Sequence, residues 1–433
     1  MEKRKLGLWT SAALVVGNTI GSGIFLAPAV LARYGSIGLI GWLVSALGAY
    51  FLARVFINFH DFVPGKSGGP YTYSRIGLGD FGGFQVAWGY WISVWATNAT
   101  ISIATIGYLG VFFPILKENL LIAVLTGLAI VWSLVWLNTR GIKEAGIFQL
   151  ITTVLKIAPL VAIGIFGIFF VQWQNFTPFN TGLVGNFEAI TACAALTLFS
   201  FLGVESATIP AEEVADAKRV VSKATLFGFI LTVIIYFVTS FVVMGIIPNA
   251  ELSESSAPFA EVARRMWGKP GEWIVAAGAV FSTLGALNGW ILIQGQIPAI
   301  AARDKLFPQV FGKLNSRNAP VGSLIISSVF ISVLMLMNYT RGLVGAFKFA
   351  LLLASMTALI AYLYTAVSLA LTAYREGIRG PALIRQVLIA TFAFLFGLWA
   401  IIGSGQEVVF WGFIMLLLGV PVYAVLKVKE VKD

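Results

Sequence analysis

The stretch GNTIGSGIFLAP, residues 17–28, decides the fold of this chain. It lies inside a run without charged residues, 6–32, and such a run is long enough to cross a bilayer, which takes about 20 apolar residues. Two glycines flank Ser22 near the middle of this run, and Pro28 follows five residues after Gly23. Glycine and proline both weaken the hydrogen-bond ladder of a helix. The stretch therefore predicts a membrane-spanning helix that is broken near its centre, with close helix packing through small residues as the alternative.

A second stretch of the same kind lies about 180 residues further along the chain. FSFLGVESA, residues 199–207, also places serine and glycine at mid-span, adds Glu205 and is followed by Pro210. Two interrupted helices at corresponding places in two halves indicate an inverted-repeat transporter with its site at the bilayer midplane. The predicted parts are repeat one over about 6–171, repeat two over about 187–374, and two extra helices over about 382–427.

The whole chain has the composition of a membrane protein. Of its 433 residues, 58% are hydrophobic and only 11% are charged, whereas soluble domains carry about 25% charged residues. Two apolar stretches, 145–171 and 189–211, hold one ionisable residue each, Lys156 and Glu205. Ten further runs of at least 19 residues contain no charge: 6–32, 34–53, 81–116, 119–139, 224–250, 273–302, 318–340, 349–374, 386–406 and 408–426. We therefore expect an all-α membrane protein with about twelve transmembrane helices, forming a single domain over 1–433.

The basic residues are distributed unequally between the two sides of the predicted bundle. With the N-terminus inside, 21 of the 29 lysines and arginines fall on inner segments, seven fall on outer segments, and Lys156 lies within a span. The positive-inside rule then places both termini in the cytoplasm, with the chain spanning the cytoplasmic (inner) membrane many times. This distribution also accounts for the net charge of +10 without a nucleic-acid partner.

Several classes of function are excluded by what the chain lacks. A single cysteine, Cys193, and a single histidine, His60, supply neither a zinc or iron–sulfur site nor a nucleophilic catalytic centre, so we expect no metal, no cofactor and no enzyme. The phosphate-binding motif G-x-x-x-x-G-K-[ST] is absent, which leaves ATP-driven pumping unsupported. A channel would need a pore-lining ring. The paired broken helices suit a secondary transporter with alternating access better.

The breaks themselves predict a binding site, because lipid cannot satisfy unwound backbone groups. Amides around Ser22, Gly23 and Ile24 begin the outer half of the first broken helix, where the positive end of the helix dipole favours a carboxylate. The carbonyl groups expected to face an ammonium are those of Ile20, Phe199 and Leu202. A zwitterionic amino-acid backbone fits this arrangement.

At these stretches the sequence resembles the amino acid–polyamine–organocation (APC) superfamily, nearly from end to end. The motifs that carry the resemblance are GSGIF at 21–25, SGGPY at 67–71, FLGVES at 201–206, EV at 213–214 and GIIPN at 245–249. The pattern is most similar to the bacterial basic amino acid/polyamine antiporters, which include arginine/agmatine exchangers. The resemblance implies a LeuT-like five-plus-five inverted repeat with discontinuous helices 1 and 6, alternating access across the bilayer, and frequent homodimers.

The resemblance also implies roles for individual side chains. Asn98 matches a side-chain contact of the arginine antiporters, and Trp290 matches the tryptophan that stacks on the guanidinium. Tyr90 and Tyr362 match tyrosines that line the pocket, and Glu205 matches a carboxylate tied to proton sensing and gating. At the breaks, Ser22 and Gly23 match positions that hold the substrate carboxylate. Ile20 and Phe199 match positions that hold its amino group.

Two residues depart from the pattern of the arginine antiporters. Phe199 stands where they carry a gating tryptophan, and Lys156 stands where they have an apolar residue. Lysine at that place resembles neutral amino-acid exchangers and proton-coupled permeases of the same superfamily, and its ammonium would replace a structural sodium ion, with Ser282 among the hydroxyls it would meet. We therefore expect sodium-independent exchange or proton-coupled transport of amino acids or their amines, with cationic substrates favoured. A neutral amino acid exchanger or proton-coupled permease is the alternative.

Overall fold

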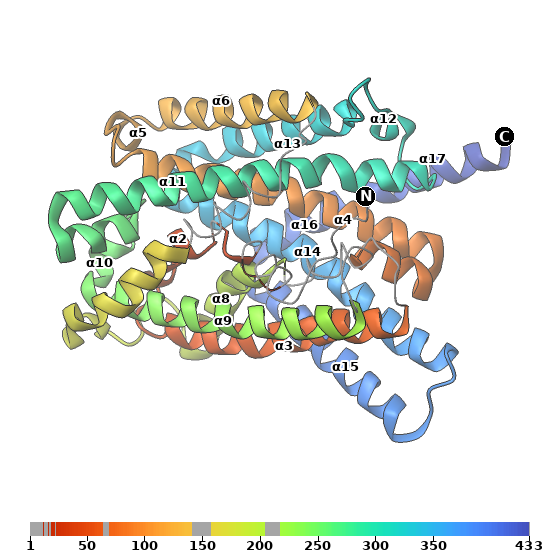
Figure 1. The fold of residues 1–433 in the computed structure, drawn as a ribbon, viewed down its shortest axis with the longest axis horizontal. Coiled ribbons are helices and arrows are strands. Elements are labelled where there is room, and N and C mark those ends of the chain that lie inside the picture. Colours follow the sequence, from red (N-terminus) through yellow and green to blue (C-terminus); the bar gives the residue numbers. More distant parts are fainter. Residues whose placement is uncertain are drawn as a thin grey trace, which may run out of the picture.

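The computed structural model describes residues 12, 16, 19–21, 23–63, 69–140, 157–203 and 217–432. Within these ranges every regular element is a helix (Figure 1). Eight helical stretches are long and apolar enough to cross a membrane, and three shorter apolar helices accompany them. The prediction of an all-α, multi-pass membrane protein is confirmed, whereas the count of twelve spans stays a prediction.

Most of the long helices run along one axis of the molecule (Figure 1). The long helices are α3 (Gly38–Phe62), α4 (Gly69–Leu109), α6 (Leu120–Thr139), α9 (Ala217–Ile246), α11 (Pro258–Arg303), α13 (Val321–Asn338), α14 (Gly342–Arg375) and α15 (Gly380–Gly403). The shorter helices are α2 (Gly23–Ala32), α5 (Ile115–Glu118), α8 (Asn186–Leu198), α10 (Asn249–Leu252), α12 (Gln309–Gly312), α16 (Gln406–Leu417) and α17 (Gly419–Lys432). Short 3-10 turns are η1 (Gly167–Phe170), η2 (Trp173–Phe176), η3 (Phe199–Phe201) and η6 (Tyr339–Arg341).

The ends of several helices differ from the ends of the runs without charge. α3 continues to Phe62, although Arg54 ends its charge-free run at residue 53. A long charged side chain does not end a helix, because its apolar stem packs along the helix while its head reaches more polar surroundings. The run of charge-free residues therefore marks the hydrocarbon part of a span and not the whole helix.

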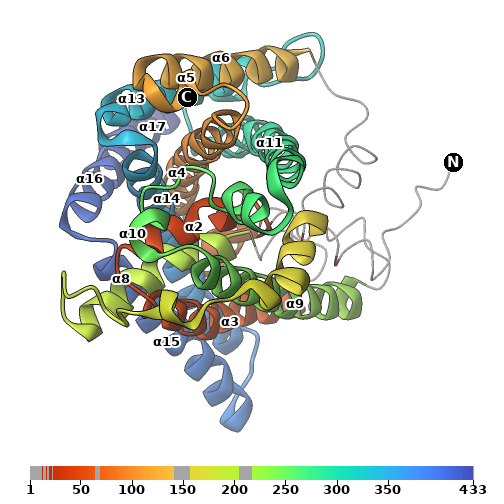
Figure 2. The same ribbon diagram turned by 90° about the vertical axis from the view of Figure 1, so that its left-hand side faces the viewer.

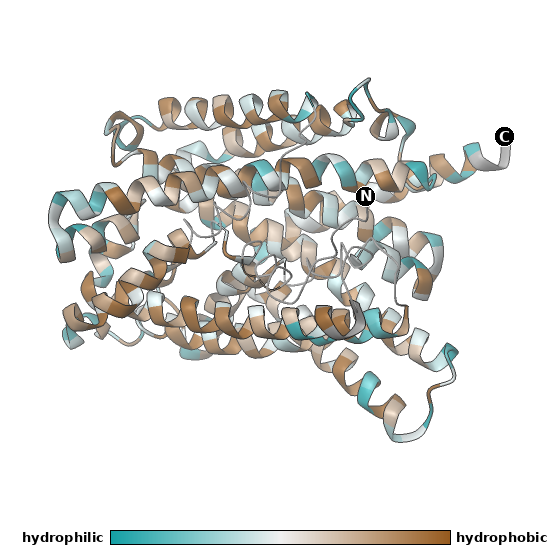
Figure 3. Cartoon of the chain, in the orientation of Figure 1, coloured by the Kyte–Doolittle hydropathy of each residue, from teal (hydrophilic) through white to brown (hydrophobic). Residues whose placement is uncertain are grey.

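Hydrophobic residues predominate along most of the helices (Figure 3), and many large ones are exposed. Leu388 and Phe392 of α15 and Trp136 of α6 are each more than half exposed. Exposed apolar surface on this scale marks contact with a membrane. The interior is formed around α4, which contacts α14, α11, α13 and α6 and is almost entirely buried in its most apolar part (Figure 2).

Two long helices contain one sharp kink each, and both kinks are at a glycine. Gly79 in α4 has φ 76° and ψ −170°, and Gly268 in α11 has φ 69° and ψ −164°. A positive φ of this size favours glycine, which has no Cβ to clash with the backbone. Each kink separates a short leading helix from a long span, and the two leading helices lie at opposite ends of the molecule (Figure 1).

Two short helices, α2 and α8, lie among the long ones and against each other. α2 contacts α9, α11 and α14, and α8 contacts α3, α14 and α15. The approach of α8 to α3 depends on Gly41, because a Cβ there would lie 2.6 Å from the Cβ of Cys193. Cys193 is fully buried. This packing brings the ends of α2 and α8 into the interior of the bundle.

Candidate functional site

α8 ends at the stretch that the sequence singled out. α8 ends at Leu198, and the 3-10 turn η3 follows, closed by a 3.1 Å hydrogen bond from the Leu202 amide to the Phe199 carbonyl. Leu202 is extended and Gly203 has φ +97°. The backbone therefore leaves the helical path at Leu202 and Gly203. The Phe199 carbonyl already accepts one bond, and a carbonyl oxygen has a second lone pair.

The chain around Ile20 is interrupted as well. Thr19 is helical, Ile20 and Gly21 form a bend, and α2 begins at Gly23. The Thr19 carbonyl accepts a hydrogen bond from the Gly21 amide at 2.9 Å and another from the Tyr236 hydroxyl of α9 at 2.7 Å. A side chain from a different helix thus supplies a partner for a carbonyl at the break, as a buried carbonyl requires.

The two breaks touch each other directly. A Cβ built on Gly23 would lie 2.5 Å from the Ser200 Oγ and 3.1 Å from the Phe199 Cδ1. Real Cβ atoms essentially never approach another heavy atom to 2.5 Å, so only glycine fits at this position without a shift of its neighbours. The Ser200 Oγ is buried and has no hydrogen-bond partner within the described parts of the chain.

A small pocket lies where the breaks meet. Its lining residues come from both breaks and from α4 and α11: Thr19, Gly21, Gly23, Thr97, Ile101, Phe199, Ser200, Leu202 and Trp290. Its volume is about 20 Å³, which is enough for a single water molecule and far less than an amino acid needs. An amino acid therefore fits here only if the described helices around the pocket move apart.

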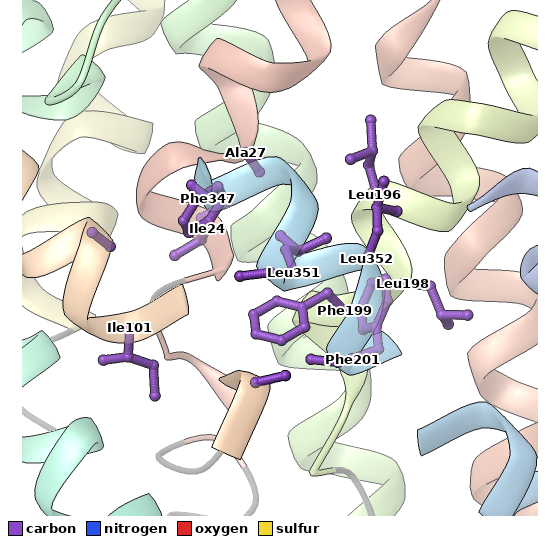
Figure 4. Close-up of a cluster of buried hydrophobic side chains, with 14 of the residues drawn as sticks. Ile24, Ala27, Ile101, Leu196, Leu198, Phe199, Phe201, Phe347, Leu351 and Leu352 are labelled. Carbon is purple, nitrogen blue, oxygen red and sulfur yellow. The ribbon is translucent and has the colours of Figure 1, made fainter. Parts of the chain in front are cut away.

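An apolar layer adjoins the pocket at Phe199 (Figure 4). Ile24 of α2 and Phe347 of α14 lie side by side, and the ring of Phe199 lies next to Leu351 of α14. All four side chains are buried. Three elements that are far apart in the sequence therefore form one apolar wall beside the breaks.

Four of the residues proposed for the site line this pocket, namely Gly23, Phe199, Leu202 and Trp290. Five others are buried but are not part of its lining: Ile20, Ile24, Tyr90, Asn98 and Tyr362. Tyr362 of α14 packs edge-on against Phe56 of α3, with 4.9 Å between ring centroids.

Asn98 lies in a polar network between helices. Its Nδ2 donates to the Gln294 Oε1 at 2.7 Å, and the Gln294 Nε2 donates to the Ser328 Oγ at 2.9 Å. The Asn98 Oδ1 has no hydrogen-bond partner among the described residues, although Asn98 is fully buried. Asn98 therefore holds an unused acceptor one residue away from Thr97, which lines the pocket.

Sequence reasoning missed Thr19, Gly21, Thr97, Ile101 and Ser200 as lining residues. Thr97 and Ile101 are four residues apart on α4 and therefore lie on one face of it. The sequence shows this spacing, but only the packing of α4 against the helix breaks shows that the face with Thr97 and Ile101 is turned toward the breaks.

Three proposed residues, Ser22, Lys156 and Glu205, lie outside the described residues. The hydroxyl suggested as a partner for Lys156, that of Ser282 in α11, is fully buried. It has no hydrogen-bond partner in the part of the chain that the structure describes.

A pocket between the start of α2 and the end of α8, inside a bundle of long apolar helices, is the arrangement expected of a membrane transporter. Comparison of the sequence with protein-family models agrees with this class. The model of the amino acid permease family matches residues 6–426, so the chain belongs to that family, within the APC superfamily. The predictions of a transporter rather than an enzyme, and of this superfamily, are confirmed.

Characterised relatives match the chain over nearly its whole length. An arginine/ornithine antiporter of Pseudomonas aeruginosa is 32% identical over 94% of this chain and 87% of its own length. A putrescine transporter of Haemophilus influenzae is 30% identical over 99% of this chain and 98% of its own. An arginine/agmatine antiporter of Chlamydia trachomatis is 29% identical over 96% of this chain and 89% of its own.

The hydrogen bond from Tyr236 to the first break is expected to stabilise the fold. Tyr236→Phe removes the hydroxyl and keeps the ring, which packs against Trp42 and Phe201. Since the Thr19 carbonyl keeps its bond from the Gly21 amide, the expected loss in free energy of unfolding is about 1 kcal/mol. Thermal unfolding of the purified protein in detergent measures it.

The matched control is Tyr374→Phe, because Tyr374 is 57% exposed and its hydroxyl makes no hydrogen bond within the described chain. An unfolding temperature of Tyr236→Phe equal to that of the control would show that the break does not depend on this bond.

Proposed function

We propose that this protein is a secondary active transporter that exchanges cationic amino acids or their amines across the cytoplasmic membrane by alternating access. The observation that carries the proposal is the meeting of two helix breaks at a pocket lined by Trp290. The backbone groups of a break bind the polar head of an amino acid, and an aromatic face attracts a cation. Arginine, ornithine, agmatine and putrescine, the substrates named for the relatives, all carry an ammonium or guanidinium group.

The proposed architecture is an inverted repeat of five plus five spans followed by two more, with both termini in the cytoplasm. Two pairs of features support it. The breaks at Ile20–Gly21 and Leu202–Gly203 are about 180 residues apart, and the kinks at Gly79 and Gly268 are about 190 residues apart. The leading helices of α4 and α11 lie at opposite ends of the molecule, as the two halves of an inverted repeat require (Figure 1).

The proposed binding mode uses the positive end of α2 for a carboxylate. The amides of Ser22, Gly23 and Ile24 would hold it, while carbonyl oxygens at Ile20, Phe199 and Leu202 would accept from the ammonium. The pocket must expand for this, because its present volume is about 20 Å³. Separation of α2 from the turn that holds Phe199 is the movement that would open it.

Coupling is assigned to the two ionisable residues of the predicted spans. Glu205 follows the second break and is proposed as the proton-linked gate, and Lys156 is proposed to take the place of a sodium ion with Ser282 in reach. A buried charge within a membrane span is costly, and it is usually retained for function. Transport should then respond to pH and should not require sodium.

Counterflow in liposomes tests these assignments together. Purified protein is reconstituted into liposomes loaded with arginine, and uptake of labelled arginine is measured with external sodium or with N-methylglucamine in its place, at several pH values. We expect saturable uptake that ornithine, agmatine and putrescine inhibit, with equal initial rates in both cations. Exchange of leucine or alanine in preference to arginine would establish the neutral alternative, and ionic conductance would contradict a transporter of this type. Light scattering of the same protein tests the homodimer that the resemblance implies.

Asn98 is proposed to accept from the cationic end of the substrate, with Gln294 as its positioning residue. Because the Asn98 Nδ2 is engaged by Gln294, the carboxamide is held with its oxygen unused. Gln294→Leu is expected to raise the inhibition constant of agmatine in the counterflow assay about two- to tenfold, the range for one hydrogen bond.

A double-mutant cycle separates this role from general packing. In an Asn98→Leu background, Gln294→Leu should have no further effect on the agmatine constant. Asn288→Leu breaks a comparable amide pair, that of Asn288 with Asn138, and serves as the control. If Gln294→Leu raised the agmatine constant equally in the wild type and in the Asn98→Leu background, Gln294 would not act on the substrate through Asn98.

A further inference from the structure

A groove with two arginines lies between α3 and α15, and none of its lining residues belongs to the helix breaks. The groove has a volume of about 380 Å³. Its walls include Phe51 and Arg54 of α3 and Ile384, Arg385, Leu388 and Phe392 of α15. The first half of α15 leans away from the bundle (Figure 1).

Two contacts hold the walls of the groove together. The Asn58 Nδ2 donates to the Gln386 Oε1 at 2.8 Å, and the rings of Phe51 and Phe392 stack with 5.2 Å between centroids. A polar contact and an aromatic contact therefore both join α3 to α15. The groove is a defined space between two connected helices and not a gap left by a detached one.

The two arginines have no carboxylate partner among the residues that the structure describes. Arg75, Arg265 and Arg341 form ion pairs with acidic side chains. In contrast, neither Arg54 nor Arg385 makes an ion pair or a side-chain hydrogen bond with any residue that the structure describes, and no acidic residue lines the groove. The groove therefore carries two uncompensated positive charges.

The two arginines lie toward adjoining ends of α3 and α15, from where their long side chains can reach the headgroup boundary of a bilayer. α3 has 25 residues and is about 37 Å long, which exceeds the hydrocarbon core of about 30 Å. Arg54 lies about 12 Å from the Phe62 end of α3, and Arg385 lies about 8 Å from the Gly380 end of α15. The apolar side chains Leu388 and Phe392 continue from there toward the middle of the span.

We propose that this groove binds one anionic phospholipid of the membrane. Its phosphate would lie between the guanidinium groups of Arg54 and Arg385, which match phosphate oxygens in planar, bidentate geometry. Its acyl chain would lie along Phe51, Leu388 and Phe392. Basic pockets between helices near the cytoplasmic leaflet recognise anionic headgroups in this way. The apolar remainder of the groove favours a phospholipid over a free phosphate ion.

The test compares lipids of one acyl composition with different headgroups. Delipidated protein in detergent receives phosphatidylglycerol or phosphatidylcholine, and native mass spectrometry and thermal unfolding report binding. For the wild type we expect retention of phosphatidylglycerol and a rise in unfolding temperature that phosphatidylcholine does not produce. The double variant Arg54→Gln/Arg385→Gln should weaken phosphatidylglycerol binding about 30-fold, because the loss of each positive charge near the membrane surface lowers the affinity about fivefold.

Three controls make the result specific. Lys305→Gln/Lys313→Gln removes two exposed positive charges elsewhere and should leave the lipid shift unchanged. Arg54→Lys/Arg385→Lys keeps both charges but not the bidentate geometry, so it should retain more of the lipid shift than the glutamine variant and less than the wild type. Inorganic phosphate should give no shift.

Several results would overturn the proposal. These are an equal shift from phosphatidylcholine, an equal shift from inorganic phosphate, or full retention of phosphatidylglycerol by the double glutamine variant. A change from dimer to monomer in that variant without loss of lipid would assign the groove to a second copy of the chain instead.

Discussion

Gly23→Ala is expected to lower the rate of arginine exchange at least about tenfold. The added Cβ would lie 2.5 Å from the Ser200 Oγ and 3.1 Å from the Phe199 Cδ1, so these side chains must shift at the point where the two breaks touch. Overpacking of this kind costs about 1–3 kcal/mol. It also displaces the amides that we assign to the substrate carboxylate. Initial rates of counterflow and the unfolding temperature measure the two effects.

A second substitution gives this prediction its control. Ser200→Gly removes the Oγ, which lies closest to the new methyl group, and the Cβ, so the double variant Gly23→Ala/Ser200→Gly should recover much of the lost rate. Gly289→Ala adds a methyl group in open space within α11 and should change little. A wild-type rate for Gly23→Ala, or no recovery in the double variant, would contradict direct contact between the breaks during transport.

Trp290→Leu is expected to weaken the binding of arginine about 2- to 30-fold. Trp290 lines the pocket, and a cation over an aromatic ring gains about 0.5–2 kcal/mol. Leucine keeps an apolar side chain but has no aromatic face. Inhibition constants in the counterflow assay should be compared for arginine and citrulline, which has nearly the same shape without the charge. The arginine constant should rise and the citrulline constant should change much less.

Trp273→Leu is the matched control, because Trp273 is also on α11 but is 51% exposed on the outer surface. Equal losses for arginine and citrulline in Trp290→Leu would assign Trp290 to the packing of the pocket and not to recognition of a cation. Loss in the Trp273 variant as well would point to a general effect on α11.

The positions of the interruptions could be predicted from the sequence, because the cause is local. Gly21 and Gly203 lie at the two interruptions, and the helices around them stop there. The left-handed φ of Gly203 is an example, since this conformation strains residues with a Cβ. The kinks at Gly79 and Gly268 have the same local cause, yet no pattern set these two glycines apart from the many others in the chain.

The lining of the pocket was only partly predictable. Four residues predicted for the site do line the pocket: Gly23, Phe199, Leu202 and Trp290. Asn98 was also predicted, but it lies in a hydrogen-bond network with Gln294. Gln294 carried no signal in the sequence, because an amide in a span reveals its role only when its partner is known. The partner is 196 residues away.

The sequence by itself determined the class of this protein and the places where its helices break. Both depend on short-range properties, namely the transfer of apolar side chains into lipid and the backbone freedom of glycine. Only the tertiary structure decided which side chains surround the breaks, how closely Gly23 approaches Ser200, and that α15 leaves a basic groove beside α3. These features depend on contacts between segments far apart in the chain, and such contacts exist only once the helices have packed.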